Sequence, residues 1–405
     1  MPAPELTAED LLARYAEVVA RVGVNVQPGQ LVAIRGLVEH APFARAIARA
    51  CYAAGAGRVD VDYADDVVRH AGIAHGASAA LAEATPVDHA ALDRLESEGA
   101  AIVRLSGNPD PHLMDDLDPT AVVAAEKREL AVRQREVLMG GRVAWNIVAA
   151  PNPGWARAVL GEPDVDRLWQ LVATAVRLAE PDPVQAWRDH LAVLGRRAAA
   201  VEALGLDHLH YEGPGTDLTI GLLPGARWVG GGLTTDAGVE YAPNLPTEEV
   251  FSSPDPRRAD GVVALARPLM MPSTGILVEG LVLTFEGGRI VDARAESGGQ
   301  AVLAELDSHP NARRLGEVAL VDRTSRVREA GVIFHDTLYD ENAGAHLAWG
   351  QAFPFCMPAA ASPELVNTAP VHTDVVVGGP GVSITGVLAD GTRIPLIADD
   401  LWALD

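Results

Sequence analysis

The sequence of 405 residues contains only two cysteines, Cys51 and Cys356, which lie far apart in the chain. Two such thiols provide neither a disulfide framework nor a set of thiolate metal ligands. The sequence also lacks a charge-free apolar run of about 18 residues, the length that a membrane-spanning helix requires. Its first residues show no basic stretch followed by an apolar one, so no signal peptide is expected. These absences predict a soluble protein without a membrane partner, in the reducing cytoplasm.

Basic residues are scarce, and lysine is nearly absent. Lys127 is the single lysine, arginine supplies the other basic side chains, and the formal net charge at pH 7 is −23. This charge argues against nucleic acids and anionic membranes as partners, because both require a basic surface. Lys127 lies in the polar part of an expected helix. Schiff-base chemistry and phosphate binding by a P-loop lysine are therefore excluded.

The length of the chain predicts two domains, with a boundary near residues 195–205. In residues 1–200, helical periodicity alternates with short apolar strands, the order typical of an α/β domain with a mostly parallel sheet. Residues 201–405 contain short alternating runs separated by glycine turns. Such runs predict a β-rich α+β domain with a curled or barrel-like antiparallel sheet.

Three polar clusters resemble functional sites, but structural roles explain them better. His208 and His210 share one face of an expected strand, and a structural role is expected for both. The sequence HLMDD, residues 112–116, lies in a turn-rich stretch, where a solvated cap is expected. The sequence GPGTD, residues 213–217, lacks the dinucleotide-binding spacing and precedes a strand, so it predicts a tight turn.

Two segments of the second half place acidic side chains in or beside apolar sequence. The sequence NLPTEEVFSSPD contains the adjacent carboxylates Glu248 and Glu249, followed by an aromatic residue and a proline turn. Glu317 is the only acid in the apolar part of the expected strand RRLGEVALV. An ionised carboxylate there is costly unless positive charge meets it. That charge is supplied either by an arginine, in a structural pair, or by a metal ion.

Two further segments add histidines beside acids. In the sequence LYDENAGAHLAWGQAFPF, Glu341 and His346 precede an apolar, aromatic run, so the cluster is either a metal site or a polar cap before the core. The sequence PVHTDVVVGG places His372 and Asp374 two positions apart, on the same side of an expected strand. Such a pair is either a pair of metal ligands or an ordinary hydrogen-bonded pair.

Taken together, the four segments supply two histidines and at least three carboxylates without a cysteine. This mixture of nitrogen and oxygen ligands suits two Zn, Co or Mn ions that share a bridging carboxylate and a water molecule. Two such ions, about 3.5 to 4 Å apart, lower the pKa of that water toward neutrality and polarise a carbonyl group. This is the chemistry of amide hydrolysis, and the residues therefore predict a metallohydrolase.

The segments PTEEVF, LGEVALV, TLYDENAGAHLAWGQ and VHTDVVVG resemble, in order, the metal-binding segments of the dinuclear-metal aminopeptidases. This family includes aminopeptidase T, aminopeptidase S and the thermophilic leucyl aminopeptidases. YAEVVARVGVNVQPGQLV and YEGPGTDLTIGL match further stretches, so the resemblance covers nearly the whole chain. It implies release of the N-terminal residue from a peptide substrate, a dinuclear centre with a bridging hydroxide, and a homodimer.

The resemblance also assigns the site residue by residue. Glu317 would be the carboxylate shared by both ions, and Glu341 an outer ligand or a residue that orients a ligand. Glu249 or Glu341 would pass the proton to the leaving amine. Glu248 is expected to be exposed or structural. The full set of implied metal ligands is Glu249, Glu317, His346, His372 and Asp374.

One position departs from the family pattern. Phe353 stands seven residues after the ligand histidine, where the family has a tyrosine whose hydroxyl is expected at the metal centre. The loss of such a donor costs roughly 3 to 4 kcal/mol of transition-state stabilisation. One alternative is therefore an inactive binding homologue. Another is a ring-opening dioxygenase that holds a single Fe(II) through His346, His372 and Asp374, although it would leave Glu249 and Glu317 without a role.

Overall fold

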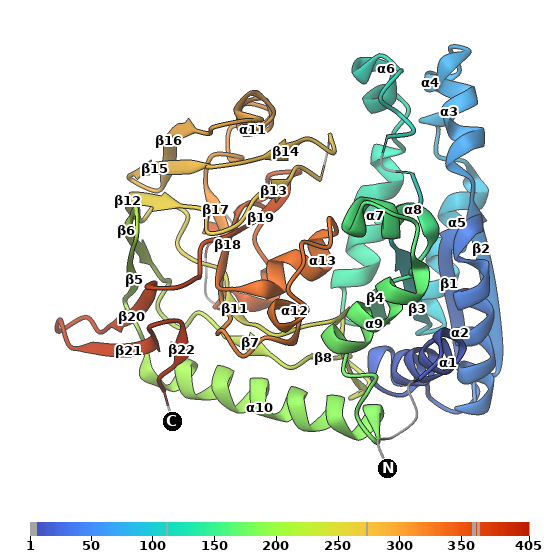
Figure 1. Ribbon diagram of the computed structural model, residues 1–405, viewed down its shortest axis with the longest axis horizontal. Coiled ribbons are helices and arrows are strands. Elements are labelled where there is room, and N and C mark those ends of the chain that lie inside the picture. The colour runs from blue at the N-terminus through green and yellow to red at the C-terminus, as the bar shows by residue number, and fades with distance from the viewer. Residues whose placement is uncertain (1–5, 111, 273, 359–361, 363–364, 405) are drawn as a thin grey trace. The chain divides into compact units, whose positions relative to one another are not determined.

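The computed structural model describes residues 6–110, 112–272, 274–358, 362 and 365–404. The chain divides into two compact units, coloured from blue to red along the sequence in Figure 1. Unit 1 runs to Arg188 and also includes Gly232–Leu245, whereas unit 2 comprises Asp189–Gly231 and the chain from Pro246 onward. This division falls within helix α10 (Pro183–Leu204), as does the expected boundary at residue 200. Among the described residues, no helix has the length and apolar character needed to cross a membrane.

Unit 1 contains a parallel sheet of five strands, as the sequence predicts. The strand order is β10-β4-β3-β1-β2, and every pairing is parallel. The short strand β10 belongs to the segment that returns to unit 1 from later in the chain. An antiparallel pair is formed by β8 (Leu233–Thr234) and β9 (Glu240–Tyr241). The strands of the parallel sheet are β1 (Leu31–Leu37), β2 (Arg58–Ala64), β3 (Ala101–Ser106), β4 (Ala144–Ala149) and β10 (Asn244–Leu245).

Helices connect these strands, and local sequence signals set their ends. α1 begins after Thr7, whose hydroxyl accepts a hydrogen bond from the Asp10 N–H while the Asp10 carboxylate accepts one from the Thr7 N–H. This capping box satisfies two backbone donors at the start of the helix. The described helices of unit 1 are α1 (Ala8–Val18), which continues into the π-helical turn Val19–Gly23, the short η2 (Val38–His40), α2 (Ala41–Ala53), α3 (Asp66–Ala74), α4 (Ser78–Leu81), α5 (Pro86–Ser97), α6 (Pro119–Ala124), α7 (Arg128–Met139), α8 (Pro153–Leu160) and α9 (Val165–Ala175).

The larger sheet of unit 2 has eight antiparallel strands in the order β16-β15-β12-β6-β5-β20-β21-β22. Within the described part of the chain, its edge strands β16 and β22 do not pair with each other. The expected antiparallel sheet is present, but a barrel-like closure is wrong, because a barrel requires its edges to be hydrogen-bonded. The strands are β5 (His208–Gly213), β6 (Thr216–Gly221), β12 (Ala259–Ala264), β15 (Val282–Glu286), β16 (Arg289–Arg294), β20 (Ser383–Val387), β21 (Arg393–Ala398) and β22 (Leu401–Trp402).

The smaller sheet of unit 2 has five antiparallel strands in the order β19-β18-β17-β11-β7. Its strands are β7 (Val229–Gly230), β11 (Val250–Ser252), β17 (Leu315–Leu320), β18 (His346–Gly350) and β19 (His372–Val376). A separate antiparallel pair consists of β13 (Leu269–Met270) and β14 (Leu277–Val278). The remaining described helical segments are α11 (Gly299–Leu306), α12 (Arg326–Glu329), α13 (Thr337–Asp340), η3 (Glu341–Ala343) and η4 (Pro354–Cys356).

The two sheets of unit 2 share one hydrophobic core. Leu209 and Leu218 belong to it from the larger sheet, and Val318, Leu347 and Val375 from the smaller sheet. Side chains of a strand alternate between the two faces of its sheet. The residues next to these three in sequence therefore point to the face of the smaller sheet that lies away from the core. That face carries the predicted metal ligands.

Candidate metal centre

Three neighbouring strands carry four of the predicted metal ligands. Glu317 lies on β17, His346 on β18, and His372 and Asp374 on β19. The strand register pairs Ala348 with Glu317 on one side and with Asp374 on the other. Because side chains alternate along each strand, all four ligands project from the face away from the core. The register of the sheet thus brings together residues that are far apart in the sequence.

Small residues separate the ligands on this face. Ala319, Ala348 and Gly350 occupy the alternate positions of β17 and β18. Gly350 has a φ of +96°, and a Cβ atom there would lie 2.0 Å from the carbonyl oxygen of Val371. Both features exclude a larger residue at this position. The short side chains leave the space above the sheet to the carboxylates and imidazoles.

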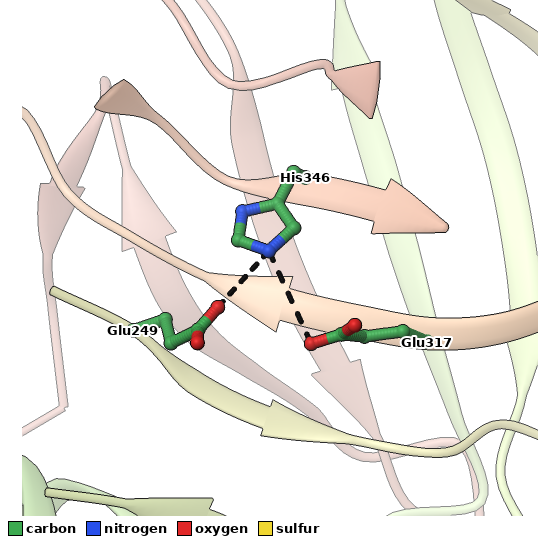
Figure 2. Close-up of side chains that lie close together, drawn as sticks. All are labelled: Glu249, Glu317 and His346. Atoms are coloured by element: carbon green, nitrogen blue, oxygen red, sulfur yellow. Dashed lines mark ion pairs between the residues drawn. The ribbon is translucent and has the colours of Figure 1, made fainter. Parts of the chain in front are cut away.

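The first group of potential ligand atoms comes from Glu249, Glu317 and His346, and one atom of each lies within 4.8 Å of the others. His346 Nε2 is 3.0 Å from Glu249 Oε2 and 4.0 Å from Glu317 Oε1. Figure 2 shows the imidazole facing both carboxylates. Glu249 directly precedes β11, the strand that pairs with β17. All three side chains are buried.

The second group comes from Glu317, His372 and Asp374, again with one atom of each within 4.8 Å of the others. His372 Nε2 is 3.1 Å from Glu317 Oε2 and 3.5 Å from Asp374 Oδ1. Glu317 therefore belongs to both groups and turns a different carboxylate oxygen to each histidine. This is the arrangement expected of a carboxylate shared between two ions.

Backbone carbonyl groups fix the orientation of both histidines. His346 Nδ1 lies 3.2 Å from the carbonyl oxygen of Gly344, and His372 Nδ1 lies 2.8 Å from that of Gln351. A carbonyl oxygen only accepts, so each Nδ1 carries the proton and donates it. In the neutral form of each ring, Nε2 then presents its lone pair to the carboxylates. Histidines that bind metals are commonly held in this way.

The donor set fits divalent metal ions. Glu249 Oε2 and Asp374 Oδ1 are buried, and within the described residues each faces an imidazole Nε2 at ion-pair distance, which can donate a hydrogen bond only when the ring is protonated. A buried acceptor without a donor is costly. A bound cation would satisfy both oxygens. The mixture of carboxylate oxygen and imidazole nitrogen matches the preferences of Zn, Co and Mn.

The pKa values of the cluster reflect the crowding of buried negative charge. Burial, together with the carboxylates of Glu249 and Asp374, raises the pKa of Glu317 to about 7. Burial and the same neighbours raise the pKa of Glu341 well above its usual value. Burial alone would lower the pKa of His346, but the adjacent Glu249 carboxylate raises it to about 9. The metal-free cluster thus retains protons, and divalent cations would remove the repulsion that holds them there.

Asn342 links the two segments that carry the remaining acids. Its Oδ1 accepts a hydrogen bond of 2.7 Å from the Glu248 N–H, and its Nδ2 donates to the Leu338 carbonyl oxygen and to Glu341 Oε1. Glu248 is only 6% exposed, so an exposed location for it is wrong. Its side chain instead lies 3.4 Å from His190 and accepts from the Arg326 N–H. Glu248 is thus part of the structural support around the centre.

The Asn342 link predicts a measurable effect on metal binding. Asn342→Leu is expected to lower the free energy of unfolding by about 1–3 kcal/mol, because the Glu248 N–H loses its buried acceptor. It is also expected to weaken zinc binding by about 10- to 100-fold, because Glu249 follows directly in the chain. The control is Asn146→Leu, which removes a buried hydrogen bond that Asn146 Nδ2 donates to the Ala242 carbonyl oxygen in unit 1. Equal zinc affinities in a chelator-competition titration of the two variants would contradict this role.

Phe353 lies directly against one of the histidines. Its ring centroid is 5.2 Å from that of His372, and it also contacts the rings of Phe251 and Phe355 at 5.3 and 5.4 Å. The Phe353 N–H donates to Ser253 Oγ, which holds the backbone at this point. The position at which a departure from the family pattern is expected is therefore next to the candidate centre, and its ring is part of an aromatic cluster.

The other polar clusters noted in the sequence do not join this centre. His208 pairs with Asp207 and His210 with Asp217, each at 2.9 Å. His112 pairs with Asp115 in a largely exposed turn. The sequence GPGTD forms the expected tight turn between β5 and β6.

The fold and the two ligand groups are those of a metal-dependent hydrolase. A model of the family described as "Thermophilic metalloprotease (M29)" matches residues 8–402. The chain therefore belongs to this family of metallopeptidases. The resemblance inferred from four short segments is confirmed, and so is the predicted class of enzyme, a metal-dependent hydrolase of peptide bonds.

Relatives and a solved structure agree with this assignment. Aminopeptidase T of Thermus aquaticus is 39% identical over 97% of this chain and 98% of its own length. Aminopeptidase 2 of Geobacillus stearothermophilus is 36% identical over 98% of both chains. The structure of wild-type AmpT from Thermus thermophilus superposes with a TM-score of 0.91 at 36% identity, covering 98% of this chain and 99% of that one.

Proposed function

We propose that this chain is a metal-dependent aminopeptidase that releases the N-terminal residue of peptides at a dinuclear centre. One ion would be held by Glu249, Glu317 and His346, and the other by Glu317, His372 and Asp374. The observation that carries this proposal is the position of Glu317, whose two oxygens face different histidines. When bound, two divalent ions supply an activated water molecule and polarise the scissile carbonyl group.

The carboxylate of Glu341 is the best candidate for handling the proton. It belongs to neither ligand group of the described residues, yet burial, together with the carboxylates of Asp374 and Glu249, raises its pKa well above the usual value. A carboxyl group that keeps its proton near neutral pH suits a donor to the leaving amine. Asn342 Nδ2, at 3.4 Å, holds Glu341 Oε1 in place. Glu249, by contrast, acts as a metal ligand in this proposal.

The dioxygenase alternative is less well supported by the same geometry. A single Fe(II) on His346, His372 and Asp374 would leave Glu249 buried against His346 without a function. It would also give no reason for Glu317 to lie between the two histidines. The interpretation as an inactive binding homologue rests only on Phe353. Activity assays of the natural chain and of a variant at this position distinguish it from the aminopeptidase.

Metal content tests the proposal directly. Purified protein is expected to bind two Zn, Co or Mn ions per chain, one for each ligand group, as measured by mass spectrometry of the metals. Removal with 1,10-phenanthroline should abolish hydrolysis of Leu-p-nitroanilide, and added Zn, Co or Mn should restore it. One iron per chain without hydrolysis would instead support the dioxygenase. A metal-loaded protein that cleaves no aminoacyl-p-nitroanilide or dipeptide would refute the aminopeptidase.

The remaining features of the proposal concern organisation. We place the catalytic centre in the C-terminal domain, expected over residues 201–405, and the α/β domain in residues 1–200. We further propose a homodimer in the cytoplasm, with a peptide as the substrate. Light scattering of the purified chain measures the oligomeric state, and a monomeric mass at micromolar concentration would contradict the dimer.

A further inference from the structure

Behind the candidate centre, on the core side of the smaller sheet, lies a buried acid that the proposed chemistry does not use. Glu305 is on α11 and is 8% exposed. Its Oε1 accepts one hydrogen bond of 2.9 Å from Trp349 Nε1 and another of 2.5 Å from Thr373 Oγ1. Both donors are themselves buried. One carboxylate oxygen therefore joins α11 to two strands at once.

These two strands are the ones that carry the histidines. Trp349 on β18 and Thr373 on β19 are direct partners in the antiparallel register. Thr373 lies between His372 and Asp374 in the sequence, so its side chain projects from the opposite face of the sheet. The Glu305 carboxylate thus contacts, from the core side, the residue that separates two ligands.

The surroundings make a carboxylate an unusual choice for this place. Val302 and Leu306 on the same helix, and Leu347 and Val375 on the two strands, belong to the hydrophobic core. Burying a carboxylate among such side chains is costly unless hydrogen bonds compensate. An apolar side chain of similar size would hold α11 against the sheet without that cost. A role in packing alone therefore does not explain Glu305, whereas directional bonds to both strands do.

We propose that Glu305 is a positioning residue, which holds β18 and β19 so that His346, His372 and Asp374 point correctly toward the metal ions. The inference rests on the proposed metal centre and extends it to the far side of the sheet. Hydrogen-bonded supports of this kind matter because ligand atoms must be held within about 0.5 Å of the productive geometry. In this case the support acts through the strand backbone instead of through a ligand side chain.

The test compares paired substitutions in the full-length protein. Glu305→Leu removes the acceptor, and Thr373→Val removes one donor at nearly constant volume. Each is expected to weaken zinc binding by about 10- to 100-fold, the usual effect of losing a support behind a metal site. Glu305→Gln keeps an oxygen acceptor and Thr373→Ser keeps the hydroxyl, so both should retain affinity close to that of the natural chain. Zinc affinity is measured by titration against a competing chelator.

A matched control separates positioning from general stability. Thr216→Val removes the acceptor of a partly buried hydrogen bond, which the Ala264 N–H donates to Thr216 Oγ1 in the larger sheet. It is expected to lower the melting temperature of the metal-free protein without changing zinc affinity. If Glu305→Leu and Thr373→Val do the same, the Glu305 contacts are merely structural and the proposal is overturned. If Glu305→Leu does not fold, the pair Thr373→Val and Thr373→Ser decides.

The zinc titration does not depend on catalysis. A natural chain that binds zinc but hydrolyses no peptide would refute the aminopeptidase and leave the role of Glu305 open to measurement. For an active enzyme, steady-state kinetics at saturating zinc adds a second readout. Because the ligands lose their positioning, Glu305→Leu is expected to have a lower kcat with KM nearly unchanged. Zinc affinity and kcat restored in Glu305→Gln would support the proposal. Equal kcat values for Glu305→Leu and Thr216→Val would count against it.

Discussion

Glu317→Gln is expected to lower kcat/KM for Leu-p-nitroanilide at least about a thousandfold, equivalent to roughly 4 kcal/mol of transition-state stabilisation. The side chain keeps its shape, but it loses its charge and one of its two oxygen ligands. Because Glu317 faces His346 with one oxygen and His372 with the other, the amide can serve at most one ion as an oxygen ligand. The metal content is therefore expected to fall below that of the natural chain.

The same substitution also tests the residue assignment. Glu202→Gln neutralises a carboxylate of unit 2 that accepts a hydrogen bond from the Trp228 N–H, and it should change neither metal content nor kcat/KM. Metal content by mass spectrometry and initial rates at several substrate concentrations are the measurements. Unchanged activity in Glu317→Gln would remove Glu317 from the centre and, with it, the dinuclear arrangement. A loss of activity with full metal content would limit its role to the reaction step.

Much of the centre is predictable because the alternation of side chains along a strand depends only on residues that are close in sequence. The spacing of His372 and Asp374 already places both on one face, and the apolar residues around Glu317 already indicate a buried acid. The distances between strands are not predictable in this way. They depend on the register that pairs Ala348 with both Glu317 and Asp374, and register is a property of contacts between segments far apart in the chain.

The two supporting residues, Asn342 and Glu305, show different limits of prediction. Asn342 lies in a polar run beside Glu341, so a supporting role is suggested, but not its bond to the Glu248 N–H. Glu305 is one acid among apolar residues of a short helix, a pattern shared with many solvent-facing acids. Only the packing of α11 against the sheet reveals that it meets Trp349 and Thr373.

The fold shows the same division between local and distant information. The alternation of helices and strands correctly predicts a parallel sheet in the first half, because each element has its own periodicity. The later segment that returns to unit 1 joins this sheet only through β10, a strand of two residues, Asn244–Leu245, which has no periodicity to detect. The barrel-like closure expected in the second half is wrong for a related reason. Alternating strands look alike whether the edges of their sheet pair or stay open.

Phe353→Tyr is expected to raise kcat by up to about 100-fold, or roughly 2.7 kcal/mol, because the new hydroxyl can donate to the developing oxyanion. The ring is already held against His372, at 5.2 Å between centroids, and its backbone N–H is bound by Ser253. The tyrosine therefore needs no new backbone position, and its metal content should equal that of the natural chain. Phe355→Tyr adds the same hydroxyl to the neighbouring ring, which stacks on Phe353, and is expected to leave kcat unchanged.

Three outcomes of this experiment have different meanings. A higher kcat in Phe353→Tyr alone would mean that the natural chain is a slow member of its family, limited by one missing donor. Equal rates in the natural chain and Phe353→Tyr would mean that another group already stabilises the oxyanion, contrary to our expectation. Activity that appears only in Phe353→Tyr, with the same bound metals in both proteins, would make the natural chain a binding homologue. In that case the intact ligand set would serve binding, and a single phenylalanine would separate the binding protein from the peptidase.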